Sequence, residues 1–191
     1  IVVENKMIVG IIGVSDQLKK DSRKAISILN KRGYRTVMLT GDNERTAKAI
    51  ARKVEIKTVI ARVLPENKKK KVEELQRRGM VAFVGDGIND APALKQANVG
   101  IAIGSGSDIA IEAGDIVLAK GNIMGVVKAM SLSKATFSKI KQNLFWAFFY
   151  NGIAIPLAIA GMLNPVVAEL AMASSSITVI TNANLLRFKR I

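Results

Sequence analysis

The stretch "MVAFVGDGINDAPAL" (Met80–Leu94) places two carboxylates, Asp86 and Asp90, in a glycine-rich loop directly after an apolar run. The run Met80–Val84 has the length and composition of a buried strand, and Asp90–Ala97 those of a helix. Acids that follow a buried strand are costly unless they pair with or bind something. The stretch therefore predicts a strand, a ligand-binding loop and a helix in succession.

The same alternation of strand and helix extends to about Gly121. Strand-like runs are Met7–Val14, Tyr34–Thr40, Thr58–Val63, Met80–Gly85, Val99–Gly104 and Asp115–Ala119, and helix-like runs are Lys19–Gly33, Glu44–Val54, Pro65–Gly79 and Asp90–Ala97. Strands this apolar are expected to be buried on both faces, which is typical of a parallel sheet with helices on each side. We therefore predict an α/β, doubly wound fold for this part of the chain.

The composition limits the available chemistry. The 191 residues include 29 Lys and Arg against 15 Asp and Glu, and neither Cys nor His. Imidazole and thiolate chemistry are therefore excluded, and the net charge of +14 favours a phosphorylated ligand, an anionic membrane surface or nucleic acid. The run Lys68–Lys71 lacks the interleaved aromatic residues that stack on bases, so we interpret it as a helix face and expect no nucleic acid. Because the chain begins with Ile and shows no signal peptide, we expect a piece of a longer protein.

The character of the chain changes at about Asn143. The stretch Asn143–Met162 carries no charge, Val166–Leu186 carries only Glu169, and each is long enough to cross a bilayer as a helix. Lysines precede the first stretch and basic residues follow the second, which predicts that both ends lie in the cytoplasm. We predict an all-α transmembrane hairpin, with a buried hairpin of a soluble protein as the alternative.

Three polar clusters follow predicted strands: "TGDN" (Thr40–Asn43), "LPENK" (Leu64–Lys68) and "GDGIND" (Gly85–Asp90). In an open parallel sheet, ligands bind beyond the carboxyl ends of the strands. We therefore expect the three clusters to converge on one site although they lie far apart in the sequence. Taken alone, "TGDN" is equally consistent with a capped turn, and Lys68 with a surface lysine.

The residue types in these clusters suit phosphoryl chemistry, which depends on positioning and on neutralising charge. Carboxylates are the ligands that Mg²⁺ prefers, so we predict Asp86 as a magnesium ligand, with Asp90 assisting directly or through water. Lys68 supplies a point charge against phosphate oxygens. The Thr40 hydroxyl and the Gly41 N–H group can donate to a phosphoryl oxygen.

The three clusters, in this order and spacing, resemble the signatures of the P-type ATPases of the haloacid dehalogenase superfamily. The resemblance covers nearly the whole chain, and its most specific part is "VGDGINDAPAL" (Val84–Leu94). It implies that Thr40 and Gly41 contact the phosphoryl group, that Lys68 stabilises an aspartyl phosphate and that Asp86 holds Mg²⁺. The catalytic residues that it implies are Thr40, Gly41, Asp42, Lys68, Asn89 and Asp90, and Asp16 resembles the hinge aspartate near the nucleotide.

The hairpin resembles the last two membrane segments of the heavy-metal (PIB) members. The pair Tyr150–Asn151 resembles one ion-site signature, and "MASSS" (Met172–Ser176) resembles that of copper(I) exporters. The resemblance implies Tyr150, Asn151, Met172 and Ser176 as ion-site residues. A thioether is a soft ligand that suits Cu(I), whereas a zinc pump would be expected to show an intramembrane carboxylate or Lys. Asn and Ser can instead bind helices together, and Met can simply pack.

The resemblance also predicts what the chain lacks. No Asp-Lys-Thr-Gly-Thr phosphorylation motif is present in the sequence. We therefore expect an incomplete phosphorylation domain (1–121), a stalk helix (122–142) and a membrane hairpin (143–191), whose partner is the N-terminal part of the same pump. The strand that carries the nucleophile and six membrane segments would be missing, which should leave apolar surface uncovered.

The expected function is part of an ATP-driven Cu(I) export pump in the cell membrane, with Mg²⁺ and ATP as its cofactor and substrate and with a possible copper chaperone as a partner. On its own, this chain is expected to be inactive. Pumps for silver, Cu(II) or zinc are the alternatives within the class. A soluble phosphatase of the same superfamily and a non-catalytic binding module are the alternatives outside it.

Overall fold

A computed structural model describes residues 2–10, 17–86, 88–104, 112–119, 121–162 and 164–189. The chain divides into two compact units, Ile1–Val126 and Val127–Ile191, which are called the first and second unit below. The predicted boundaries at residues 121 and 142 remain a prediction, because one helix runs through both the predicted stalk and the first predicted span.

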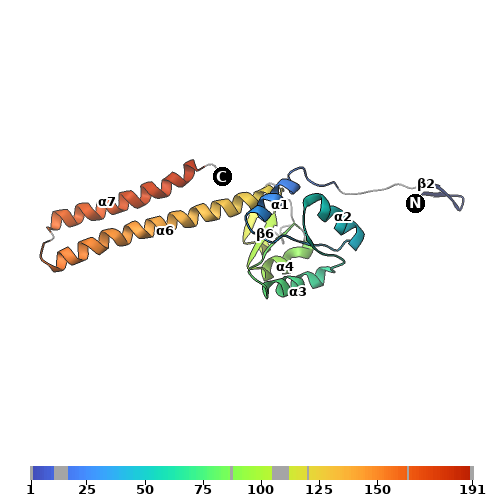
Figure 1. Cartoon of the computed structure of the whole chain (residues 1–191), viewed down its shortest axis with the longest axis horizontal. Helices are drawn as coiled ribbons and strands as arrows, with labels where there is room; N and C mark the ends of the chain where they lie inside the picture. Colours follow the sequence, from blue (N-terminus) through green and yellow to red (C-terminus); the bar gives the residue numbers. More distant parts are fainter. Residues whose placement is uncertain are drawn as a thin grey trace. The chain divides into compact units, whose positions relative to one another are not determined.

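The first unit contains short parallel strands with helices between them (Figure 1). Its elements are α1 (Ser22–Lys31), β3 (Val37–Leu39), α2 (Glu44–Val54), β4 (Thr58–Ile60), α3 (Pro65–Gln76), β5 (Ala82–Gly85), the 3-10 turn η1 (Ile88–Asp90), α4 (Ala91–Gln96), β6 (Val99–Ile103) and β7 (Ile116–Leu118). Strand β3 pairs with β4, and β5, β6 and β7 pair in that order, all in parallel. The predicted parallel α/β architecture is therefore confirmed, but among the described residues the sheet is split in two.

The prediction that Met7–Val14 forms a strand of this sheet is wrong for its described part. Strand β2 (Met7–Gly10) instead pairs antiparallel with β1 (Val2–Glu4) as a hairpin. Its turn residues Asn5 and Lys6 have positive φ angles of 48° and 67°. Such a turn matches the twist of paired antiparallel strands, so local turn chemistry decides the pairing here.

The helices of the first unit cover the sheets through small and aliphatic side chains. Helix α2 buries Ala47, Ala51 and Val54, and the Asn43 side chain caps its first turn by accepting from the Thr46 N–H group at 2.9 Å. Helix α4 packs against β5 and β6 and buries Leu94 against Ala102. Only β6 has a fully buried centre, and β3 and β4 are half-buried. The prediction of strands buried on both faces thus holds for β6 alone, because a two-stranded sheet offers little to pack against.

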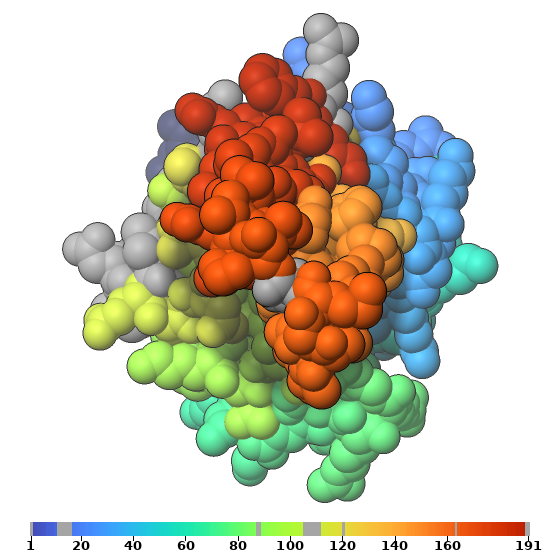
Figure 2. All heavy atoms as spheres, turned by 90° about the vertical axis from the view of Figure 1, so that its left-hand side faces the viewer, coloured from blue at the N-terminus to red at the C-terminus, as the bar shows by residue number. Residues whose placement is uncertain are grey.

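The second unit is a helical hairpin of α6 (Met124–Ile159, whose first residues belong to the first unit) and α7 (Pro165–Asn184), followed by the 3-10 turn η2 (Leu185–Phe188). The two helices lie side by side (Figures 1 and 2). Their half-buried residues repeat at helical spacing and define the seam between them: Asn143, Ala147, Tyr150 and Ala154 on α6, and Ala168, Ala171, Ser175, Thr178 and Asn182 on α7. Small side chains allow the helix backbones to approach closely, as in membrane helix pairs.

Among the described residues, one helical segment, Pro165–Phe188, is long and apolar enough to cross a membrane, and none of it is buried. The first predicted span, within α6, does not meet the same criterion. Its apolar residues are interrupted by Asn143, Tyr150 and Asn151. The two-span topology therefore remains a prediction.

Candidate phosphoryl-transfer site

Backbone hydrogen bonds join the first predicted cluster to the chain that follows β4. The Thr40 N–H group donates to the Ile60 carbonyl at 3.0 Å, and the Val63 N–H group donates to the Thr40 carbonyl at 3.0 Å. The parallel pairing of β3 and β4 thus continues past the strand ends. As expected, the loops after these two strands lie at the same edge of the sheet.

The Thr40 hydroxyl is engaged within its own turn. It donates to Asp42 Oδ2 at 3.0 Å and accepts from the Asp42 N–H group at 3.1 Å. The capped-turn interpretation of "TGDN" is therefore correct, since Asn43 also caps α2. A phosphoryl contact from the Thr40 hydroxyl would require its proton to leave Asp42, whereas the Gly41 N–H group has no such competing role among the described interactions. The phosphoryl roles of Thr40, Gly41 and Asp42 remain predictions.

An ion pair joins the second and third predicted clusters. Lys68 Nζ lies 2.6 Å from Asp90 Oδ1, and the two side chains are only 18% and 13% exposed. Asp90 is the one charged or polar residue that is buried in the described part of the chain. Lys68 extends from the first turn of α3, and Asp90 closes the turn η1 before α4. Lys68 is therefore a part-buried, paired residue and not a lysine of the open surface, and its phosphoryl role remains a prediction.

Gly85 makes room for the Asp90 carboxylate. A Cβ atom at Gly85 would lie 2.7 Å from Asp90 Oδ2 and 2.9 Å from its Cγ. Any larger residue would push the carboxylate away from its present position. The glycine at the end of β5 thus serves the Lys68–Asp90 pair, a steric role that the sequence pattern could only suggest.

Asp86 and Asn89 are the exposed polar residues of the same loop. No hydrogen bond or ion pair of Asp86 is found among the described residues, and the described residues contain no cluster of three or more acids that could enclose a metal. Mg²⁺ usually takes one or two protein carboxylates and completes its shell with water and phosphate oxygens. An exposed Asp86 fits that arrangement. Asp90 can offer only Oδ2, because Oδ1 binds Lys68.

A basic residue also lowers the pKa of Glu44, an exposed carboxylate beside the "TGDN" turn. A hydrogen bond from Lys48, together with the charge of Lys48, lowers the pKa of Glu44, which opens α2. Glu44 is fully exposed, so solvent screens this pairing. The acid complements the positive end of the helix dipole next to the "TGDN" turn.

A pocket lies next to the predicted site residues and does not contain them. It encloses about 370 Å³ and is lined by Ala61, Arg62, Val63, Asn67, Lys70, Lys71 and Glu74. Lys68, Asp86 and Asp90 are absent from this lining. This pocket is therefore not the predicted phosphoryl site.

The predicted ion-site residues occupy different faces of the hairpin. Tyr150 is half-buried in the seam, whereas Asn151, Met172 and Ser176 are exposed, with 70% of Met172 accessible. Among the described residues of the hairpin, no contact brings these four side chains together. All four assignments remain predictions. Asp16, the predicted hinge residue, lies outside the described residues.

Sequence reasoning missed Asn182, which is the main polar contact of the hairpin. Its Oδ1 accepts from Lys139 Nζ at 2.6 Å, and its Nδ2 donates to Asn143 at 2.7 Å and to Gln142 at 3.3 Å. An Asn inside a predicted apolar span was the available signal, because polar groups there are expensive and usually have a partner.

A family model and the sequences of similar proteins indicate the same family for this chain. A model of haloacid dehalogenase-like hydrolases matches residues 1–98. The chain is 52% identical over 98% of its length to a probable copper-exporting P-type ATPase of Archaeoglobus fulgidus, and 51% identical over its whole length to a copper-exporting P-type ATPase of Staphylococcus aureus. It spans 24% of the length of each of these relatives.

Solved structures extend the likeness to both units. A zinc-transporting PIB-type ATPase in the E2.Pi state is 42% identical and has a TM-score of 0.88 over 96% of this chain, which covers 30% of that structure. The catalytic domain of the CPx-ATPase CopB-B is 31% identical with a TM-score of 0.55 over 61% of this chain, which covers 46% of that domain. The chain therefore belongs to the haloacid dehalogenase-like hydrolase family and, within it, to the heavy-metal (PIB) class of P-type ATPases.

Proposed function

We propose that this chain is the C-terminal quarter of an ATP-driven heavy-metal export pump, with Cu(I) as the transported ion. In this proposal the first unit supplies the phosphate- and magnesium-binding part of a phosphorylation domain. The second unit supplies two membrane helices and part of the ion site. The observation that carries the proposal is the Lys68–Asp90 pair, which joins the signature loop after β4 to the signature loop after β5, although these strands belong to two separate parallel sheets.

The split sheet supports the idea that another segment brings the nucleophile. Strands β3 and β5 carry the "TGDN" and "GDGIND" loops, and each has only one described neighbour. A strand that paired with both free edges would join the two sheets. Its carboxyl end would then lie between Thr40 and Asp86, where an aspartyl phosphate would meet the residues predicted to bind it.

The roles of the residues follow from their surroundings. Asp90 holds the Lys68 ammonium group in place, so that its remaining N–H groups can donate to phosphoryl oxygens. The exposed Asp86 carboxylate, with support from Asn89, would hold Mg²⁺. When bound, Mg²⁺ neutralises charge on the phosphoryl oxygens. The Gly41 N–H group would donate to the same oxygens without a side chain in the way.

Two observations support copper as the transported ion: the similarity to copper-exporting relatives and the thioether of Met172. The relatives from Archaeoglobus fulgidus and Staphylococcus aureus, at 52% and 51% identity, are a probable copper exporter and a copper exporter, and Met172 offers a thioether in an apolar helix. The solved PIB-type ATPase with a TM-score of 0.88 transports zinc, so zinc remains the alternative within the class. The only ionisable residue of α7 is Glu169, one turn from its start, and no acid lies at the level of Met172. Silver, which shares the softness of Cu(I), is not separated from copper by these residues.

The test uses the full-length pump that contains this chain and measures acid-stable phosphoenzyme formed from ATP. We expect labelling that Cu(I) stimulates and zinc does not, and we expect none from the 191-residue chain alone, which has no Asp-Lys-Thr-Gly-Thr motif. Stimulation by zinc alone would assign the pump to zinc. Labelling of the isolated chain would refute the proposal that the nucleophile lies elsewhere.

A matched pair of methionine variants tests the ion site. Met172→Ala should leave phosphorylation from inorganic phosphate intact but weaken the response to Cu(I) by about ten-fold or more, because a soft ligand is lost. Met162→Ala is the control, since Met162 is as exposed as Met172 but lies between the helices. An unchanged copper response in Met172→Ala would remove Met172 from the ion site.

A further inference from the structure

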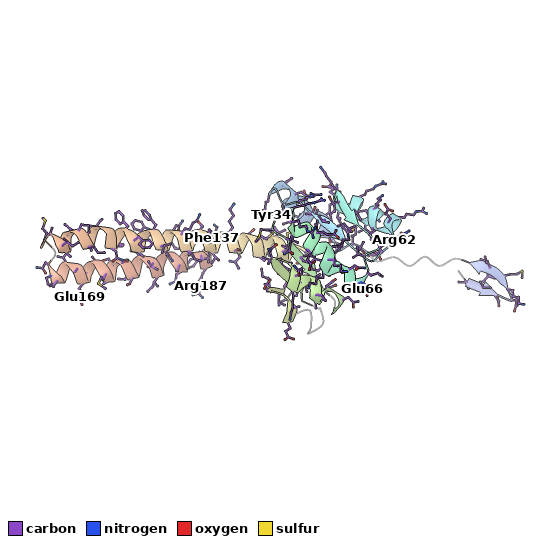
Figure 3. All side chains as sticks on the ribbon, turned by 90° about the horizontal axis from the view of Figure 1, so that it is seen from below. Tyr34, Arg62, Glu66, Phe137, Glu169 and Arg187 are labelled. Carbon is purple, nitrogen blue, oxygen red and sulfur yellow. The ribbon has the colours of Figure 1, made fainter. Side chains whose placement is uncertain are left out.

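The second unit has basic residues gathered at the open end of its hairpin. Of its residues, only Glu169 is acidic, and it lies near the closed end of the hairpin, in the second turn of α7. The open end carries Lys134, Lys139 and Lys141 on α6, and Arg187 and Lys189 after α7. Figure 3 shows this polarity: Glu169 lies toward one end of the hairpin, and Phe137 and Arg187 lie toward the other.

The Asn182 cluster brings the basic residues of the two helices to the same level. Asn182 bonds to Lys139 and Asn143, so the C-terminal end of α7 is fixed beside the middle of α6. This cluster uses the Lys139 amine, and four further basic residues around it are exposed: Lys134, Lys141, Arg187 and Lys189. We call these four residues the basic collar.

Lys141 directs its charge away from the apolar part of the hairpin. Lys141 Nζ lies 5.2 Å from the centre of the Phe137 ring, one turn toward the N-terminus of α6. The side chain therefore runs back along the helix, in the manner of a lysine that extends from an apolar region toward a polar surface. Lys134 lies about 10 Å from Lys141 along the helix axis, on the same side as Phe137.

Aromatic rings lie next to the collar on the apolar side. Phe145, Trp146, Phe149 and Tyr150 form a contiguous cluster with ring centres 5.5–6.3 Å apart. Trp and Tyr are enriched where a bilayer meets water, because their rings are apolar and carry a polar group. If the hairpin lies in a membrane, as in the proposed function, this aromatic cluster and the basic collar lie at the depth of the lipid headgroups.

We propose that the basic collar binds the phosphate groups of anionic phospholipids and enriches these lipids around the hairpin. The inference rests on the membrane location in the proposed function and adds a preference for one class of lipid. Four exposed cations without an acid at the same level attract anionic headgroups, and each one near a membrane surface changes the affinity about five-fold. Zwitterionic headgroups, whose net charge is zero, gain no comparable attraction.

The single tryptophan of the chain provides the test. The chain is reconstituted in vesicles of phosphatidylcholine with a minority of phosphatidylglycerol, and bromine, which quenches Trp146 fluorescence, is placed on the acyl chains of one lipid or the other. We expect brominated phosphatidylglycerol to quench at least about two-fold more than its share of the lipid predicts, and salt to reduce the excess.

Two matched variants, each with four charges removed, complete the design. Replacing Lys134, Lys141, Arg187 and Lys189 by Gln should reduce quenching by brominated phosphatidylglycerol to its share of the lipid. Replacing the exposed Lys24, Lys31, Lys53 and Lys57 of the first unit by Gln should leave the excess intact. Quenching in proportion to composition for the unchanged chain, or an excess that survives loss of the collar, would overturn the proposal.

A separate measurement distinguishes failure of this inference from failure of the proposed function. In vesicles made only of brominated phosphatidylcholine, Trp146 should be quenched in the unchanged chain and in both variants. Absence of quenching there would show that the hairpin does not enter the bilayer, which would overturn the membrane role itself. Normal quenching there without a preference for phosphatidylglycerol would overturn only the lipid preference.

Discussion

At the scale of single residues, the Lys68–Asp90 pair is the strongest electrostatic feature of the described chain. Its side chains are far less exposed than those of the other described ion pairs, such as Lys69–Glu73 at 51% and 45%. Screening by solvent makes exposed pairs nearly neutral in stability, whereas a buried charge without its partner is costly. The pair therefore contributes to folding of the site as well as to its proposed chemistry.

Replacing Lys68 by Ala should destabilise the first unit by about 2 kcal/mol, below the 3–5 kcal/mol typical of a fully buried pair, because some solvent reaches the carboxylate. Hydrogen exchange of the β5 and β6 amides measures this change, since these strands flank the Asp90 turn. The Asp90→Ala and double variants complete a cycle, in which we expect the double variant to lose less than the sum of the single variants.

Lys69→Ala is the matched control for this cycle. Its amine lies 3.9 Å from Glu73 on the exposed face of the same helix, so we expect a change within about 0.5 kcal/mol. Equal effects of Lys68→Ala and Lys69→Ala would contradict the special place of Lys68.

At the scale of elements, the seam of the hairpin shows which residues of α6 and α7 lie opposite each other, and this register can be tested. The Asn143–Asn182 bond fixes one level of the seam. One turn farther from the open end on each helix come Ala147 and Thr178, and both are half-buried. A Cys at each of these positions should form an intramolecular disulfide under mild oxidation, which mass spectrometry detects in a chain that has no other Cys.

The neighbouring position provides the control for this register. Phe148 is 68% exposed and points away from the seam, so a pair of Cys at 148 and 178 should oxidise at least about ten-fold more slowly. Similar rates for the two pairs would mean that the helices do not keep one register.

Most helices and strands of the first unit could be predicted from the sequence pattern alone. The alternation of apolar and charged runs identified β3 to β7 and α1 to α4, because helix and strand periods differ. The hairpin β1–β2 was missed, because its pairing depends on two residues with positive φ and not on hydrophobicity. The split of the sheet was not predicted in detail either, since pairing between strands depends on segments that are distant in sequence.

The sequence predicted which loops form the candidate site, but not the contacts between their side chains. Position after a strand was enough to predict that the loops of Lys68 and Asp90 meet, because the carboxyl ends of parallel strands lie on the same side. The role of Asp86 stays a prediction. The partner of Lys68 and the steric role of Gly85 depend on side-chain geometry, which spacing does not encode. In the hairpin, composition identified the polar residues but not the faces on which they lie.

At the scale of the whole molecule, the number of membrane crossings is open to a direct test. Single Cys residues at the exposed positions 128, 164 and 189 are labelled in cells with a maleimide that does not cross membranes. If both α6 and α7 span, Asn164→Cys should react in intact cells, and Lys128→Cys and Lys189→Cys only after the cells are opened.

The alternative gives a different pattern. If α7 alone spans, positions 128 and 164 should react alike and position 189 should differ from both. That result would contradict the two-span topology while leaving the family assignment unchanged, because the assignment rests on similarity across the chain.

Helix α6 is continuous from Met124 to Ile159, and the residues that soften a helix, Gly125, Gly152 and Pro156, lie near its ends. A helix of this length is a stiff rod of about 54 Å. It cannot absorb a twist or a push in its middle section, as a jointed connection would. A displacement imposed on the N-terminal end of α6 is therefore expected to reach Tyr150 and Asn151 with little loss, because the helix between them is continuous.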